Sequence, residues 1–369
     1  MSIERVFFAG GGTGGHIYPA IAVAEKIAQL DGSVKIHFFC SDRPVDTQIL
    51  SKTNFSYTPL GAQKLSFGPV GFFKFVHSFL KSQKIAAAQL RQCGSAVVIG
   101  TGGFVSAPVC RAAKKMGIPV KLINVDIVAG RANKLCTRWA DEVFVQFDET
   151  VEYFANRKLR VNITGCPLRK QFDEPNAEKA RTELGLTAGK KVLLVTGASS
   201  GSASINQTIC SLLEKLAAFA DTWQIVHLAG QVNFEKVAAA YKTALITAKV
   251  VGYYDNMADL LAVSDLVIGR SGAVSVAEYA AAAVPSICMP YPHHADLHQY
   301  LNAGKLVEAG AAIIVDDLPD AKDRCEWLWE ELEPLLKEDV KREQMRENCK
   351  RAAKRTVAAD IASAILHTC

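Results

Sequence analysis

Strand-like apolar runs alternate with helix-length segments along this chain, and short glycine-rich loops join several of them. The run Arg5–Ala9 leads into glycines and then into a helix predicted over Pro19–Leu30. The run Lys191–Thr196 leads in the same way into a glycine–serine loop and a helix around Ile205–Ala220. Such alternation is typical of a parallel sheet covered by helices. Two series in succession predict an α/β chain with two doubly wound, Rossmann-like domains.

Continuous apolar runs, rather than alternating ones, predict strands that are buried on both faces of a sheet. At 369 residues the chain is long for one core, and two domains of roughly 150–200 residues are expected. We expect residues 1–164, with a C-terminal helix at about 340–369, to form one domain, and residues 165–339 to form the other. Further strands are predicted over Val34–Cys40, Ala96–Gly100, Val120–Asn124, Val143–Val145, Gln224–Ala229, Ala248–Val251, Leu266–Ile268 and Ser286–Met289.

The composition is that of a soluble globular protein, with 49% hydrophobic and 21% charged residues. No stretch reaches the roughly 18 uninterrupted apolar residues of a membrane span, and the N-terminal residues lack the pattern of a secretory leader. The ten cysteines include no C-x-x-C pair, so neither a zinc site nor a disulfide framework is indicated. These features predict a cytoplasmic protein. We also expect that it has no cofactor.

Positive charge is concentrated in the first half of the chain. Between Asp46 and Asp126 there is no acidic residue, but there are ten basic ones. Within this stretch, Leu65–Lys81 carries five phenylalanines among lysines and is interrupted by glycines. Aromatic side chains beside lysines suit an anionic membrane surface, although phenylalanines at helical spacing also occur in cores. The predicted membrane-contacting residues are Phe67, Phe72, Phe73, Lys74, Phe75, Phe79 and Lys81.

Two glycine-rich loops, Gly10–His16 and Gly100–Ser106, each follow a predicted strand of the first half. Loops at the carboxyl ends of parallel strands face one crevice, where backbone N–H groups can hold a diphosphate. The glycines of the first loop also satisfy the G-x-G-x-x-G pattern of dinucleotide-binding dehydrogenases. However, Cys40-Ser41 occupies the strand end where such enzymes have an acid, which argues against a dehydrogenase.

His16 directly follows the first loop, at the mouth of the proposed crevice. An imidazole there can take up a proton near neutral pH, so we predict that His16 is a general base. The alternative is a histidine that donates a hydrogen bond to a phosphate or caps the turn.

The second half has a further strand–loop–helix motif at Gly269–Glu278. Its helix N-terminus offers N–H groups and hydroxyls to a diphosphate. Glu278 could accept the hydroxyls of a ribose, or serve only as a partner of the helix dipole. In the following segment Asp296, His298 and Gln299 could bind sugar hydroxyls. The histidines of this segment do not have the spacing of metal ligands.

Four motifs, Gly11–His16, Gly102–Ser106, Arg270–Glu278 and Asp296–Asn302, resemble in order and spacing the MurG family of bacterial cell-wall glycosyltransferases. The resemblance covers nearly the whole chain and implies a GT-B fold. It implies inverting, metal-independent transfer of N-acetylglucosamine from its UDP conjugate to the 4-hydroxyl of lipid-linked muramyl-pentapeptide (lipid I), which gives lipid II for peptidoglycan. It also implies a peripheral position on the cytoplasmic, anionic face of the inner membrane and no nucleic-acid partner.

The resemblance also assigns site residues. Arg169 and Ser199 match donor-diphosphate positions, and Tyr253 and Tyr254 occupy the stretch whose backbone holds uracil. The implied acceptor-binding residues are Gly12, Thr13, Gly14, Gly15, Gly102, Gly103 and Phe104. The implied donor-binding residues are Asp126, Asn133, Arg169, Ser199, Tyr253, Tyr254, Arg270, Ala273, Val274, Ser275, Glu278, His298 and Gln299.

One segment departs from the family pattern. Where the family usually has His-Glu-Gln-Asn, this chain has Ile123-Asn124-Val125-Asp126. The last position normally supplies an amide near the donor sugar, whereas an ionised Asp126 only accepts hydrogen bonds. Three alternatives stay open: another GT-B transferase with a lipid acceptor, such as a diacylglycerol galactosyltransferase, a UDP-sugar 2-epimerase, and a binding scaffold with weak catalysis.

Overall fold

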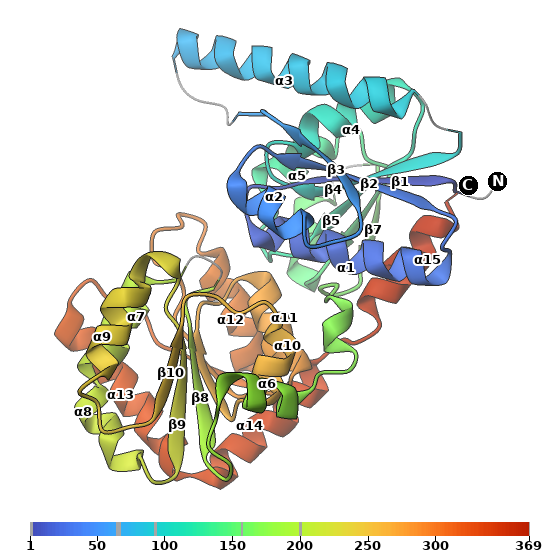
Figure 1. Ribbon diagram of the computed structural model, residues 1–369. Coiled ribbons are helices and arrows are strands. Elements are labelled where there is room, and N and C mark those ends of the chain that lie inside the picture. Colours follow the sequence, from blue (N-terminus) through green and yellow to red (C-terminus); the bar gives the residue numbers. More distant parts are fainter. Residues whose placement is uncertain (1–2, 64–67, 92–93, 156–157, 199–200, 369) are drawn as a thin grey trace. The chain divides into compact units, whose positions relative to one another are not determined.

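The computed structural model describes residues 3–63, 68–91, 94–155, 158–198 and 201–368 (Figure 1). The chain divides into two compact units, each built on one parallel sheet. The first unit comprises Met1–Lys170 with Arg355–Cys369, and the second comprises Gln171–Lys354. Two predicted site residues, Phe67 and Ser199, lie outside the described residues.

The first unit has a seven-stranded sheet in the order β3-β2-β1-β4-β5-β6-β7, with parallel pairing throughout. The strand order reverses between β1 and β4, and ligands of doubly wound sheets bind at such a point. The strands are β1 (Arg5–Gly10), β2 (Lys35–Ser41), β3 (Ser56–Leu60), β4 (Ala96–Gly102), β5 (Val120–Asn124), β6 (Glu142–Val145) and β7 (Arg160–Ile163). The α-helices are α1 (Gly14–Leu30), α2 (Pro44–Leu50), α3 (Pro69–Leu90), α4 (Ser106–Lys115), α5 (Arg131–Cys136) and α15 (Val357–Leu366).

The second unit repeats this design with a six-stranded parallel sheet in the order β10-β9-β8-β11-β12-β13, which reverses between β8 and β11. Its strands are β8 (Lys191–Thr196), β9 (Trp223–Leu228), β10 (Ala248–Val251), β11 (Leu266–Gly269), β12 (Ser286–Cys288) and β13 (Ala312–Ile314). Its α-helices are α6 (Ala177–Leu184), α7 (Ala203–Ser211), α8 (Leu213–Leu216), α9 (Phe234–Tyr241), α10 (Met257–Ala262), α11 (Ala273–Ala281), α12 (His298–Glu308), α13 (Ala321–Lys337) and α14 (Asp339–Ala352).

The central strands lie where the sequence predicts them. Val120–Asn124 and Lys191–Thr196 are confirmed residue for residue, and so is the edge strand β10, Ala248–Val251. The sequence does not predict β3, β7 and β13, which lie at sheet edges and are partly exposed. Strands β3 and β7 include polar residues and lack the continuous apolar run of a central strand, and β13, although apolar, is only three residues long.

Helix α1 begins at Gly14, well before the predicted start at Pro19, and Pro19 lies inside it. The two glycines that open α1 therefore belong to its first turn as well as to the preceding loop. Because proline has no N–H, the carbonyl of Gly15 receives no helical hydrogen bond from Pro19. The first turn of α1 thus presents polar backbone at the end of β1.

The C-terminal segment is divided between the units, and the division falls at Arg355 rather than near residue 340. Helix α14 buries Met345 and Cys349 within the second unit. Helix α15 instead lies against α1 in the first unit (Figure 1). There the buried Lys121 donates to the carbonyl of Ala364 at 2.8 Å and pairs with Glu142 at 2.6 Å. The predicted C-terminal helical segment therefore forms two helices: α14 packs in the second unit, and α15 packs in the first.

The phenylalanine-rich segment forms most of the first half of α3, which continues through Gly71. Ser78, Ser82, Ala86 and Leu90, each four residues apart, are buried along one side of the helix. Residues four apart lie on one face of a helix, so this face of α3 packs against the rest of the first unit. The aromatic and basic side chains of α3 that lie off this face are partly or largely exposed.

A fully buried imidazole, His227 on β9, joins three elements of the second unit. Its Nε2 lies 3.0 Å from Asn206 Oδ1 on α7, and its Nδ1 lies 3.0 Å from the Tyr241 hydroxyl on α9. Asn206 uses its amide nitrogen on the Ala229 carbonyl, so its Oδ1 accepts from His227. Burial lowers the pKa of His227 to about 3, and the ring is neutral in the folded protein.

Acidification should therefore destabilise the protein through His227. Between pH 6.5 and 3 the unfolded chain binds a proton that the folded chain does not, so stability falls as the pH falls through this window. We expect a loss of about 2 kcal/mol in the free energy of unfolding between pH 7 and pH 5. Urea titrations at both pH values measure it. His227→Gln should reduce the pH dependence, and an unchanged dependence would contradict this assignment.

Candidate functional site

A buried carboxylate, that of Asp46, holds the first glycine loop by hydrogen bonds. Asp46, on α2 and fully buried, accepts the N–H of Gly12 at 2.8 and 3.0 Å. It also accepts the N–H and hydroxyl of Ser41 at the end of β2, at 3.0 and 2.5 Å. A Cβ on Gly11 would lie 2.2 Å from Asp46 Oδ2, so only glycine fits there. The N–H of Gly12 is thus committed to the protein, although the sequence assigns this residue to the acceptor.

The same loop orients His16, which is half-buried in the first turn of α1. Its Nδ1 lies 3.1 Å from the carbonyl oxygen of Gly11 and 3.3 Å from the hydroxyl of Thr13. A carbonyl only accepts, so Nδ1 carries the proton of the neutral ring, and Nε2 keeps its lone pair. None of the described residues forms a hydrogen bond with Nε2. This is the tautomer that a general base requires.

The second glycine loop lies directly against the first. Gly10 and Gly102 are aligned in the β1–β4 pairing, so both loops lie at the carboxyl ends of neighbouring strands. A Cβ on Gly103 (φ +77°) would lie 2.3 Å from the Gly11 carbonyl oxygen. A Cβ on Gly102 (φ +109°) would lie 2.9 Å from His16 Nε2. These glycines are required because backbone and imidazole occupy the space of a side chain.

Other predicted residues near this edge differ in exposure. Thr13 and Gly15 are exposed, and Gly14 is buried. Phe104 lies in the second loop, and 47% of its surface is exposed. Arg169 lies at the end of the first unit, with its guanidinium 4.1 Å from the centre of the Tyr18 ring on α1. The exposed members of this group are the ones that remain accessible to a ligand.

The segment that departs from the family pattern is held by two amides. Asn124 accepts from Asn133 Nδ2 at 3.0 Å and donates to the carbonyl of Asp126 at 2.7 Å. Asn133 also donates to the carbonyl of Ile123 at 3.1 Å and is buried. Asn133 Nδ2 therefore supports the segment, and Asp126, which is half-buried, is presented by it.

In the second unit, α11 begins directly after β11 with Gly272 as its N-cap. Glycine has no side chain to cap the helix, so the first turn of Ala273, Val274 and Ser275 has the N–H groups that favour an anion. Glu278 follows on the same helix and is 7% exposed. This arrangement suits a diphosphate at the N-terminus of α11.

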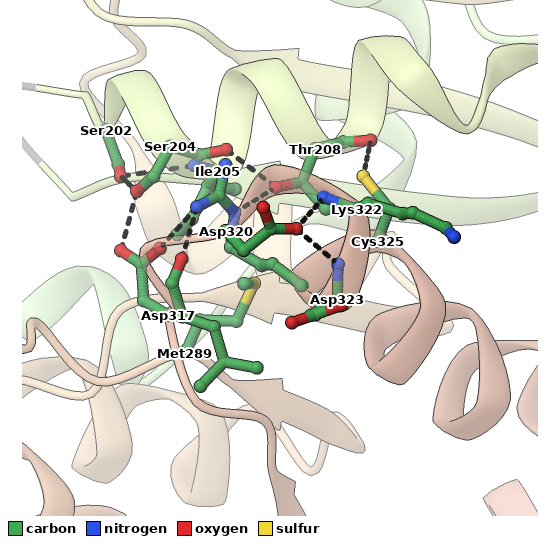
Figure 2. A network of polar contacts seen from close by, with 12 residues as sticks. Ser202, Ser204, Ile205, Thr208, Met289, Asp317, Asp320, Lys322, Asp323 and Cys325 are labelled. Carbon is green, nitrogen blue, oxygen red and sulfur yellow. Dashed lines mark hydrogen bonds and ion pairs between the residues drawn. The ribbon is translucent and has the colours of Figure 1, made fainter.

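Arg270, which precedes that N-terminus, is buried in a polar network, and Figure 2 labels Ser202, Ser204 and Asp317 of this network. Its Nη1 donates to the carbonyls of Met289 and Pro290 at 2.8 and 3.1 Å. Its Nη2 donates to Asp317 Oδ2 at 2.7 Å, and lies 2.7 and 3.1 Å from the hydroxyls of Ser202 and Ser204. Arg270 is a predicted UDP-sugar-binding residue, but both of its Nη atoms form hydrogen bonds to oxygen atoms of the protein.

The predicted sugar-binding residues are partly paired with their neighbours. His298 Nδ1 lies 2.6 Å from Asp296 Oδ1, and its ring stacks on His294 with centroids 4.2 Å apart. Burial favours a raised pKa for Asp296, but hydrogen bonds from His298 outweigh it and the pKa is lowered. Gln299 Oε1 accepts from the N–H of Tyr291 at 3.0 Å, and this bond does not use its amide nitrogen.

The two predicted uracil-flanking tyrosines differ. Tyr253 is 37% exposed, whereas Tyr254 donates its hydroxyl to Glu183 on α6 at 2.7 Å. Burial and the Glu183 carboxylate raise the pKa of Tyr254. Across the described residues, no group of three or more His, Cys, Asp or Glu side chains is arranged to hold a metal ion.

Sequence reasoning did not find Asp46, Asp317 or Arg324. Asp46 is visible only as the acid that precedes the long acid-free stretch, and Asp317 and Arg324 belong to no motif. All three act through loops that are distant in sequence, so spacing carries no signal for them.

Comparison with known proteins agrees with this arrangement. Residues 6–145 match the N-terminal domain of glycosyltransferase family 28, and residues 192–361 match its C-terminal domain. A UDP-N-acetylglucosamine--N-acetylmuramyl-(pentapeptide) pyrophosphoryl-undecaprenol N-acetylglucosamine transferase of Thermoanaerobacter sp. (strain X514) is 32% identical, covering 97% of this chain and 98% of its own. A protein of the same name from Caldanaerobacter subterraneus subsp. tengcongensis is 34% identical, covering 94% of each chain. The chain belongs to the MurG family.

Solved structures support the assignment to the MurG family and the GT-B fold. The crystal structure of Acinetobacter baumannii MurG has 25% sequence identity and a TM-score of 0.73, covering 99% of this chain and all of that one. A UDP-GlcNAc 2-epimerase from Neisseria meningitidis has a TM-score of 0.69 over 99% of this chain and all of that one, but only 14% identity. The epimerase therefore shares the fold alone. The predicted family and fold are confirmed.

The contact between Gly102 and His16 leads to a first test of the MurG-family site. Gly102→Ala should lower the turnover of glycosyl transfer roughly 10²-fold, because the new methyl group displaces the imidazole that it would meet at 2.9 Å. Binding of UDP, measured by calorimetry, should not change.

Gly117→Ala is the matched control. Gly117 also has a positive φ, +72°, but a Cβ there would meet no atom within 4 Å. This variant carries the backbone strain without the clash. Equal losses of turnover in both variants would show that strain, and not the position of His16, is responsible.

Proposed function

We propose that this chain transfers N-acetylglucosamine from UDP-N-acetylglucosamine to the muramyl 4-hydroxyl of lipid I, giving lipid II in peptidoglycan synthesis. The observation that carries the proposal is the 32–34% identity, over 94–97% of the chain, to transferases named for this donor and acceptor. The orientation of His16 supports it independently, because Nε2 is available to take a proton.

In the proposed reaction the acceptor 4-hydroxyl attacks the anomeric carbon of the donor sugar. His16 Nε2 takes the hydroxyl proton, the new glycosidic C–O bond forms, and the bond to the diphosphate breaks with inversion. A general base of this kind contributes ~10²–10⁴ in rate. The leaving UDP carries the electron pair, and the N-terminus of α11 stabilises the negative charge that develops on it. Arg169 and Ser199 are proposed to contribute there as well.

The remaining predicted residues are proposed in the roles that the family implies. The acceptor pyrophosphate would lie at Thr13, Gly15 and Gly103. Glu278 would bind the ribose, and His298 with Gln299 would bind the sugar. Asp126 would face the donor sugar as a hydrogen-bond acceptor.

The function is tested by measuring UDP release from UDP-N-acetylglucosamine with and without a lipid I analogue. We expect release only when the analogue is present, because attack by the acceptor hydroxyl expels UDP. His16→Ala should lower this rate by ~10²–10⁴ while UDP still binds. UDP binding without release in the presence of the analogue would reject lipid I as the acceptor. Near-normal turnover in His16→Ala would reject His16 as the base.

We also propose that α3 holds the protein at the anionic, cytoplasmic face of the inner membrane. Phe72 and Phe73 are 53% and 71% exposed, and Leu80 is 52% exposed. Lys74 and Lys81 lie on the same helix and are exposed, and α3 contains no acidic residue. Apolar side chains and lysines together favour an anionic bilayer surface. Among the described residues, no helix is long and apolar enough to span a membrane.

Sedimentation with vesicles tests this surface. Replacing Phe72 and Phe73 by Ser should reduce binding to vesicles that contain phosphatidylglycerol by about 10-fold, because two large apolar contacts are lost. The control replaces Val232 and Leu245 by Ser, since these are also highly exposed, at 93% and 84%, but belong to the second unit. Equal binding by the two double variants would reject α3 as the contact.

A further inference from the structure

The guanidinium of Arg270 links its own loop to three other loops of the second unit at the carboxyl ends of the strands. Arg270 follows β11, Ser202 caps α7, Met289 and Pro290 follow β12, and Asp317 follows β13. Arg270 bonds to all of the others at 2.7–3.1 Å. Its side chain is 8% exposed and that of Asp317 is 5% exposed. A buried network of this kind is rigid when every member is satisfied.

Asp317 is the anion of this network. Its Oδ2 accepts from Arg270 Nη2 at 2.7 Å and from the Ser204 hydroxyl at 2.6 Å, and its Oδ1 lies 3.6 Å from Arg324 Nη1. Arg324 lies on α13, and it donates hydrogen bonds to Thr208 Oγ1 on α7 at 2.7 Å and to the Leu318 carbonyl at 2.5 Å. Figure 2 shows Ser202, Ser204 and Thr208 along α7, with Asp317 facing the first two. Asp317 thus connects two buried cations to the start of α7.

The loops joined by Arg270 are the ones to which donor contacts are assigned. The loop before Ser202 contains Ser199, the turn after Arg270 opens α11, and Pro290 leads to the segment of His298 and Gln299. The two terminal nitrogens of Arg270 cannot bind the donor and also keep these bonds. It can set the positions of the backbone N–H groups that do.

We propose that Asp317 is a positioning residue for the nucleotide-sugar donor, acting through Arg270 on the diphosphate-binding and sugar-binding loops. The inference rests on the proposed function, because it assigns a role to a residue around the donor site. Asp317 does not touch the donor. It keeps Arg270 bonded to Ser202 and to the two carbonyls, so that the loops are set before UDP-sugar binds. Preorganisation of this kind lowers the cost of ordering the site on binding.

Replacing Asp317 by Asn distinguishes positioning from charge, because the two effects have opposite signs. The cluster of two arginines and one aspartate has a charge of +1, and the substitution raises it to +2. If only charge mattered, an anionic diphosphate would bind more tightly. If Asp317 positions Arg270, UDP should bind about 10-fold more weakly by calorimetry. The KM for UDP-N-acetylglucosamine should rise similarly, while kcat and the KM for the lipid I analogue stay within about 3-fold.

Two further variants complete the test. Ser204→Ala removes one hydrogen bond to Asp317 without burying an unpaired charge, and should weaken UDP binding about 3-fold even if Asp317→Asn does not fold. Glu142→Gln breaks the buried pair with Lys121 in the first unit, and should lower the melting temperature with no change in UDP affinity.

The outcomes separate this proposal from the proposed function. UDP affinity that is unchanged or higher in Asp317→Asn and unchanged in Ser204→Ala overturns the positioning role, whatever the acceptor. A wild-type protein that binds UDP but does not transfer to the lipid I analogue overturns the proposed acceptor, while the UDP affinities of the variants still decide the role of Asp317.

Discussion

The loops of each sheet depend on a carboxylate that is buried under them. A charge taken out of water is tolerated only when hydrogen bonds or an opposite charge replace the lost solvent. Asp46 satisfies this requirement with the N–H of Gly12 and with Ser41, and so draws the first glycine loop down onto the ends of β1 and β2. Asp317 satisfies it with Arg270 and Ser204. In both units the position of a loop at the carboxyl end of the sheet follows from the solvation of one aspartate.

Once the first loop is held, the geometry of His16 follows from backbone contacts. The Gly11 carbonyl orients Nδ1, and the second loop packs so closely that Gly102 and Gly103 have no room for a side chain. The glycines of these two loops are therefore required for close packing, in addition to any contact with a phosphate. They let two backbones and one imidazole meet at the point where the sheet order reverses. The proposed general base, His16, is oriented by a backbone carbonyl, whereas the histidine of a serine protease triad is oriented by a carboxylate.

The central strands and the order of motifs could be predicted from the sequence because both are local. A buried parallel strand such as Lys191–Thr196 shows as an apolar run, and a glycine loop shows as its own residues. The edge strand β3 shows neither, since it is half-exposed and contains Pro59. The hydrogen-bond partners of Arg270 could not be predicted either. Its motif places it beside a helix N-terminus, but its bonds run to Ser202 and Asp317, which are 68 and 47 residues away. Long-range contacts of this kind leave no mark on spacing.

The segment 123–126, which departs from the family pattern, is held by hydrogen bonds of its own. Asn124 accepts from Asn133 and donates to the carbonyl of Asp126, so the altered turn is closed by its own amides. What changes is the chemistry of the group that the turn presents. An amide can donate to a carbonyl oxygen and accept from a hydroxyl, whereas an ionised Asp126 can only accept. A sugar hydroxyl satisfies either group, but the carbonyl of an N-acetyl substituent satisfies only the amide. For the donor sugar proposed above, a hydrogen bond to the acetamido carbonyl would have to come from a group other than Asp126, and the side-chain amide of Gln299, whose Oε1 accepts from the N–H of Tyr291, can supply one.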